Sequence, residues 1–121
     1  MKTSHAQKLS FNKLRKVNLA RCEEVFHPLD NWTPAEWATA AAGELGELCN
    51  VIKKLRRLQD GTNTAKDPQT VEECRVLAAK EAADTVIYID LLCARLRIDL
   101  GEAVRSKFNE VSDRMNVAFK L

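Results

Sequence analysis

The stretch TPAEWATAAAGELGEL, residues 33–48, determines how the rest of the chain is interpreted. Thr33 is suited to be a helix N-cap, Pro34 to be the first helical residue, and Glu36 to complete a capping box with Thr33. The helix is predicted to run from Pro34 to about Gln59, with Gly61 as its stop. Along this helix, residues at alternating steps of four and three form one packed stripe: Trp37, Ala41, Glu44, Leu48, Val51, Leu55 and Leu58.

Three further helices are predicted. Apolar residues recur with a helical period over residues 11–26, and Pro28 ends that segment. Two more capping boxes predict helices over residues 71–96 and 100–115. No part of the chain has the alternating pattern of a β-strand. The predicted class is therefore all-α.

The predicted architecture is a four-helix bundle-like domain over residues 10–116, between tails at 1–9 and 117–121. The short link Arg97-Ile98 would make the last two helices antiparallel neighbours. The third helix is apolar nearly all round beyond Ala82, as expected for a helix that is central or lies at a subunit interface. The inner stripes would be Leu77, Glu81, Asp84, Tyr88 and Leu91 on the third helix, and Leu100, Val104, Lys107 or Phe108, Val111 and Met115 on the fourth.

Composition sets broad limits on function. The chain has 121 residues, with 45% hydrophobic and 30% charged residues, an ordinary globular balance. Its net charge of +2 is too small to imply a nucleic-acid partner, and the basic run at 53–57 is interpreted as a solvated helix end. No signal peptide or membrane-spanning run is apparent, so a cytoplasmic protein without a membrane partner is expected.

The cysteines form no CxxC pair and are expected to be buried, reduced thiols: Cys22, Cys49, Cys74 and Cys93.

Two acidic pairs stand out in these helices. Glu44 and Glu47 lie three residues apart, as do Glu81 and Asp84, so each pair shares one helix face. An isolated pair of this kind is usually a solvated surface feature. Here both pairs lie on apolar stripes among alanines and glycines, where carboxylates are costly to bury without a positive partner. A divalent cation would supply that partner.

Helix lengths allow the two pairs to meet. If the second and third helices pack antiparallel with aligned ends, Glu47 and Asp84 lie near the same level, and all four carboxylates fall within roughly 9 Å along the axis. Carboxylates without histidine or cysteine favour Mg²⁺, with Mn²⁺ as a substitute, over zinc. A di-iron bundle would need Glu-x-x-His motifs, and neither His5 nor His27 lies in one.

A phosphate substrate also needs positive donors. Lys54 lies two turns after Glu47 on nearly the same face, and Lys107 lies on the inner stripe of the fourth helix, so both are candidates, although each suits a surface role as well. Tyr88 and Trp32 are candidates to stack on a nucleotide base. The other large aromatics, Trp37 and Phe108, are expected in the core.

The motifs resemble those of the MazG-like all-α nucleoside triphosphate pyrophosphohydrolases, which include the dCTP pyrophosphatases. The resemblance rests on residues 43–48, 81–88 and 98–100, and runs from about 32 to 114. It implies hydrolysis of (deoxy)nucleoside triphosphates to monophosphate and pyrophosphate, as in nucleotide-pool sanitation, by a homo-oligomer, a dimer or a tetramer. It implies that Mg²⁺ is held by Glu44, Glu47, Glu81 and Asp84, and that the segment Lys107-Phe108-Asn109 and Trp32 contact the substrate.

One departure from the family concerns Gly43. Many members carry a further glutamate at this position, so the number of metal ions is left open. The mechanism that fits is attack by water on a phosphoryl group, with the metal offsetting charge. One carboxylate would accept the proton, and Lys54 or Lys107 would stabilise the departing pyrophosphate. The residues alone do not identify which carboxylate is the base.

Two alternatives remain at this point. The first is a non-catalytic, nucleotide-sensing or regulatory helical oligomer that binds nucleotide without turnover. The second is a nucleic-acid-binding bundle that uses the basic run at 53–57, which salt-sensitive duplex binding would support.

Overall fold

The computed structural model describes residues 8–121 of the chain. Its elements are α1 (Phe11–Arg21), a π-helix (Cys22–Phe26), a 3-10 turn (Leu29–Asn31), α2 (Pro34–Asp60), α3 (Val71–Arg95) and α4 (Leu100–Arg114). No strand occurs among these residues, which confirms the all-α class and its four α-helices. Most of the predicted tail at 1–9 lies outside the described residues.

The start and end of α2 follow from its sequence. The Thr33 hydroxyl accepts a hydrogen bond from the Glu36 backbone at 3.3 Å, and the Glu36 carboxylate accepts one from the Thr33 backbone at 3.1 Å. Both halves of the capping box therefore form, with Pro34 in the first turn. The helix ends where Gly61 takes a left-handed conformation with φ of 74°, which glycine adopts without strain.

The N-caps of α3 and α4 form as predicted, but the reciprocal bonds do not. Thr70 accepts from the Glu73 backbone and Asp99 from the Glu102 backbone, each at 3.1 Å. The Glu73 carboxylate, however, accepts from the Gln69 backbone at 2.7 Å. The Glu102 carboxylate pairs with an arginine one turn later on α4. The side-chain cap was sufficient to start these two helices.

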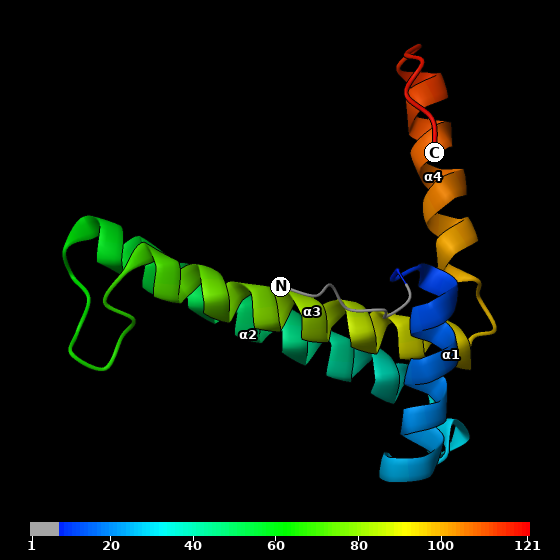
Figure 1. The fold of residues 1–121 in the computed structure, drawn as a ribbon, viewed down its shortest axis with the longest axis horizontal. Helices are drawn as coiled ribbons and strands as arrows, with labels where there is room; N and C mark the ends of the chain where they lie inside the picture. The colour runs from blue at the N-terminus through cyan, green and yellow to red at the C-terminus, as the bar shows by residue number, and fades with distance from the viewer. Residues whose placement is uncertain (1–7) are drawn as a thin grey trace, which may run out of the picture.

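Helices α2 and α3 form a long antiparallel hairpin that is the body of the molecule (Figure 1). The packed stripe predicted on α2 is confirmed, since all seven of its members are buried or partly buried. On α3 the inward face is shifted, because Thr85 and Cys74 are buried whereas Leu77 is 37% exposed. α1 packs on α3 at the open end of the hairpin, so α3 is central, as predicted. A small core there contains Cys22, Leu29, Trp37 and Leu91.

The predicted antiparallel packing of the last two helices is wrong. Helix α4 leaves the end of the hairpin and stands away from α2 and α3 (Figure 1); α1 is the only helix on which it packs to any extent within residues 8–121. Arg97 turns the chain with a left-handed φ of 59°, and Arg15 of α1 donates to the Ile98 carbonyl at 2.8 Å. Gly101 then approaches α1 so closely that a Cβ there would lie 3.0 Å from the Phe11 Cβ. These contacts direct α4 onto α1.

The position of α4 leaves apolar side chains uncovered. Phe108, which was predicted to be core, is 45% exposed, and Met115 is 66% exposed. The hairpin also exposes apolar side chains, including Leu45 at 49% and Val86 at 44%. Single exposed apolar residues are common, but the row of apolar side chains along α4 is typical of an interaction surface.

The cysteine prediction was correct for only part of the set. All four cysteines are free thiols. Cys22 and Cys74 are buried and Cys93 is partly buried, where burial raises the pKa of the Cys22 and Cys93 thiols. Cys49 is exposed, because it lies on the solvent side of α2. Among the described residues, no helix combines the length and the apolar character needed to cross a membrane.

The loop between α2 and α3 is fixed by one ion pair. Arg57 donates to both carboxylate oxygens of Asp67, at 2.8 and 3.2 Å, and the Thr64 backbone donates to the same carboxylate at 3.0 Å. The hydrogen bonds from Arg57 and Thr64 lower the pKa of Asp67 to about 2. The loop therefore depends on an ionised Asp67.

We expect Asp67→Asn to lower Tm by a few degrees at neutral pH. Because the folded-state pKa is depressed, the stabilisation is present above the unfolded value of 3.8 and is lost as pH falls through about 2. The difference in Tm between the two proteins should therefore shrink over that interval in thermal melts followed by circular dichroism. Asp60→Asn, which alters an exposed pair with Arg56, is the control. An equal difference at all pH values would contradict the assignment.

Candidate functional site

Three carboxylates meet between the two long helices. One oxygen each from Glu44, Glu81 and Asp84 lies within 4.8 Å of the others. Glu81 and Asp84 occupy successive turns of α3, and Glu44 faces them from α2. Glu44 and Glu81 are partly buried and Asp84 is exposed, so the cluster is open on one side. The hairpin thus brings Glu44 together with two acids that lie 37 and 40 residues later in the sequence.

The cluster is electrostatically unfavourable without a cation. Burial raises the pKa of Glu44, and the charges of Asp84, Glu81 and Glu47 raise it further. None of the ion pairs within residues 8–121 involves these four carboxylates. A bound cation would remove the repulsion that the chain itself does not offset.

The donor set fits a hard divalent cation. All three donors are carboxylate oxygens, the ligands that Mg²⁺ and Mn²⁺ prefer. Opposite oxygens around an octahedral Mg²⁺ lie about 4 Å apart, and these three oxygens lie within 4.8 Å of one another. Three protein donors leave coordination positions for water and for substrate phosphates. His27, the one histidine among the described residues, lies instead beside two tryptophans.

Glu47 lies close to this group but outside it. Its charge acts on Glu44, yet its side chain is exposed and is not within the 4.8 Å set. The helix lengths predicted that Glu47 and Asp84 lie at the same level along the helix axes. In the structure, the α2 residue opposite Asp84 is Glu44. The two helices are therefore offset by about one turn from the aligned arrangement. The metal assignment of Glu47 stays a prediction.

Two glycines beside the cluster border open space. Gly43 and Gly46 are exposed, and a Cβ at either position would meet nothing within 4 Å. They therefore do not permit a close approach of helices within this chain. They leave open space beside Glu44, on the solvent side of α2.

Lys54 lies in another part of the hairpin. It follows Glu44 by ten residues on α2, about 15 Å along the helix. There it lines a hollow of about 560 Å³ at the loop end, with Asp67 and Glu73 among its neighbours. The structure does not bring Lys54 to the carboxylate cluster.

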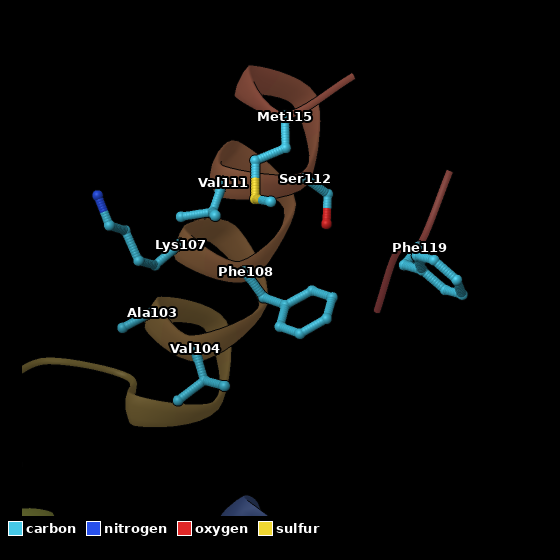
Figure 2. A pocket seen from close by; sticks show the side chains of 8 residues that line it. All are labelled: Ala103, Val104, Lys107, Phe108, Val111, Ser112, Met115 and Phe119. Carbon is cyan, nitrogen blue, oxygen red and sulfur yellow. The ribbon is translucent and has the colours of Figure 1, made fainter. Parts of the chain in front are cut away.

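Lys107 and Asn109 lie on α4, away from the cluster. Figure 2 shows Lys107 at one side of an apolar groove of about 680 Å³ along α4, with Phe108 and Phe119 toward the other side. The Lys107 ammonium pairs with Glu110 at 3.3 Å. The Asn109 amide accepts from the Leu121 backbone N–H at 2.9 Å and donates to the Leu121 carbonyl at 3.3 Å. Within one chain Lys107 does not approach Glu44, because α4 does not pack on the hairpin.

The two aromatic candidates both pack against the small core. Tyr88 follows Asp84 by one turn and packs against the core. The Trp32 ring lies 4.6 Å from Trp37, which is buried as predicted. Trp32 also lines a hollow of about 410 Å³ along the first turns of α2, whose other walls are Ala35, Glu36, Thr39 and Ala40. Ala40 precedes Glu44 by one turn on the same helix face, so one wall of the hollow lies next to the turn that carries Glu44.

Sequence reasoning missed four polar side chains. Asp90, which is fully buried, accepts from Arg15 at 3.0 Å and from Asn18 at 3.1 Å. Arg95 donates to the backbone of Trp32 at 2.9 Å. A single carboxylate in the apolar run at 86–94 was the available signal for Asp90, because such a group requires a buried partner. No local pattern could have paired Arg95 with Trp32.

The chain was also compared with known proteins. No protein-family model matches it, and no curated protein matches its sequence.

Proposed function

We propose that this protein is a Mg²⁺-dependent nucleoside triphosphate pyrophosphohydrolase, which converts a nucleoside triphosphate and water to the monophosphate and pyrophosphate. The observation that supports this proposal is the group of Glu44, Glu81 and Asp84, whose oxygens lie within 4.8 Å of one another without a cationic partner. The order of the two acidic motifs, with Tyr88 one turn after the second, adds the family resemblance described above.

The chain's own groups divide into binding and proton-accepting roles. Glu44, Glu81 and Asp84 would hold Mg²⁺, and the bound ion would offset triphosphate charge and lower the pKa of a water. Glu47 lies beside this group with an exposed carboxylate, so it is the group left free to accept the proton of the attacking water. The water oxygen would bond to phosphorus as the bond to the bridging oxygen of the leaving pyrophosphate breaks.

The hollow beside Trp32 is the proposed site for the base. Its aromatic wall offers a face for stacking, and it lies on the α2 face that leads to Glu44. A nucleotide that lay along this face would have its base at Trp32 and its phosphates at the carboxylates.

The cationic side of the site would come from a second copy. Lys107 and Asn109 are far from the carboxylates of their own chain, and α4 has an uncovered apolar face. The hairpin exposes apolar side chains as well, such as Leu45 and Val86. We propose that α4 of one copy packs on the hairpin of another, so that Lys107 and Asn109 approach the partner's acidic site, and that the active form is a homo-oligomer, a dimer or a tetramer.

Mixing two inactive variants tests this arrangement. Glu81→Gln and Lys107→Ala are each expected to lose nearly all activity, because each removes a group from one half of a shared site. Random exchange of subunits in a dimer should restore about a quarter of wild-type activity, since half of the dimers carry one intact site. Mixing Glu81→Gln with Glu44→Gln, which affect the same half, is the control. Failure of the first mixture to recover activity after exchange would contradict the shared site.

The reaction itself is tested with a panel of single nucleotides. Purified protein is incubated with Mg²⁺ and each ribo- or deoxynucleoside triphosphate, and products are separated by anion exchange. Monophosphate and pyrophosphate are expected in equal amounts. Diphosphate and phosphate would indicate another reaction, and nucleotide-dependent stabilisation without product would select the nucleotide-sensing alternative.

A further inference from the structure

Arg95 connects α3 to the segment that carries Trp32. Its Nε donates to the Trp32 carbonyl at 2.9 Å and lies 3.6 Å from Asp30. From the other side, the Trp37 indole of α2 donates to the Leu29 carbonyl at 3.0 Å. The segment at 28–32 is therefore held by side chains of both hairpin helices, although it has only a 3-10 turn of its own.

The same segment presents the Trp32 ring in one orientation. The ring centroid lies 4.8 Å from that of His27 and 4.6 Å from that of Trp37, with tilts of 45° and 56°. Trp32 is nevertheless only partly buried, and it lines the hollow along the first turns of α2, next to the turn that carries Glu44. The ring is thus supported by packing on one side and accessible on the other.

We propose that Arg95 is a positioning residue that fixes Trp32 as a rigid stacking surface for a planar ring. The side chain of Arg95 is 28% exposed. If Arg95 is replaced, the Trp32 carbonyl loses a charged donor and only water is left to bond to it. The carbonyl belongs to Trp32 itself, so its release frees the backbone that sets the ring's direction. The ligand part of this inference rests on the proposed function, because it takes the planar ring to be the nucleotide base.

The first readout of this proposal does not depend on activity. Two indoles 4.6 Å apart couple in near-ultraviolet circular dichroism, and Trp32→Phe defines the part of the signal that requires Trp32. Arg95→Met keeps an unbranched side chain but removes its donors, and it should lose most of the dichroism signal that depends on Trp32. Arg95→Lys keeps a charged donor and should retain more of that signal than Arg95→Met. Asp30→Ala should change little, since that carboxylate is 85% exposed.

The second readout separates binding from chemistry. For dCTP and dATP, assayed separately with Mg²⁺, KM of Arg95→Met should rise about tenfold, within the range that loss of base stacking produces. kcat should stay near the wild-type value, because Arg95 does not reach the carboxylates. Arg75→Met on the exposed side of α3 carries the same change of charge and is the matched control.

Each outcome decides part of the proposal. An unchanged dichroism signal in Arg95→Met would overturn the positioning role, and a changed signal with unchanged KM would overturn its role in binding. If the wild type has no turnover, the proposed reaction fails, and binding of dCTP and dATP followed by Trp32 fluorescence replaces KM. Tenfold weaker nucleotide binding by Arg95→Met would then support the inference. Absence of binding by the wild type would overturn its ligand part, while the dichroism still tests the positioning.

Discussion

Glu81→Gln is expected to reduce nucleotide hydrolysis by about 10²–10³-fold, the range seen when one group that stabilises charge at a reacting centre is removed. Glu81 supplies one of the three oxygens within 4.8 Å, and glutamine keeps the shape of the side chain but not its charge. The remaining Glu44 and Asp84 would hold a divalent cation more weakly. Steady-state rates measured over a range of Mg²⁺ concentrations should show both a lower maximum and a need for more metal.

The fold should not suffer from this change. The pKa of Glu44 is raised in part by the charge of Glu81, so the neutral glutamine relieves repulsion. Tm of Glu81→Gln without metal should equal or exceed that of the wild type. Glu72→Gln, at an exposed pair with Arg75 on the same helix, should leave the rate unchanged. Wild-type rates in Glu81→Gln would show that the cluster is not the site.

Asp90→Ala is expected to lower the free energy of unfolding by about 3 kcal/mol, as found when one partner of a buried ion pair is removed. Asp90 is fully buried and receives hydrogen bonds from Arg15 and Asn18. Its loss leaves the Arg15 guanidinium, 25% exposed, with backbone carbonyls as its only acceptors in the described part of the chain. Because Arg15 also binds the Ile98 carbonyl, α4 should lose part of its anchoring on α1.

Urea unfolding followed by circular dichroism measures this effect. Asp60→Ala, at an exposed pair, should change stability by less than about 1 kcal/mol. Replacement of both partners by apolar residues, Arg15→Met with Asp90→Leu, should recover much of the loss, because no charge is then left unpaired. Equal stabilities of Asp90→Ala and Asp60→Ala would contradict the role of this buried pair.

The helices could be predicted because their signals are local. Thr33, Thr70 and Asp99 each bond within three residues, so their caps can be recognised without knowledge of the fold. The packed stripe on α2 was also correct, since periodicity alone defines one face. From these features the two acidic pairs could be assigned to two helices that are able to face one another.

The errors concern how helices pack together. The sequence around Arg97 and Ile98 gives a short link, but the direction of α4 depends on Arg15 and Gly101, which act on residues remote in the chain. The exposure of Phe108 follows from that direction. The level of Glu47 against α3 depends on an offset of about one turn, which side-chain packing between helices sets and helix length does not.

The central claim is that Glu44, Glu81 and Asp84 together hold a divalent cation. Titration with Mn²⁺, with free ion followed by electron paramagnetic resonance, tests it most directly, because the readout requires no substrate. The wild type should bind Mn²⁺ saturably, Mg²⁺ should compete, and Glu44→Gln combined with Asp84→Asn should abolish the binding while Glu72→Gln preserves it. Mn²⁺ binding that is the same in the wild type and in the Glu44→Gln, Asp84→Asn variant would contradict the account.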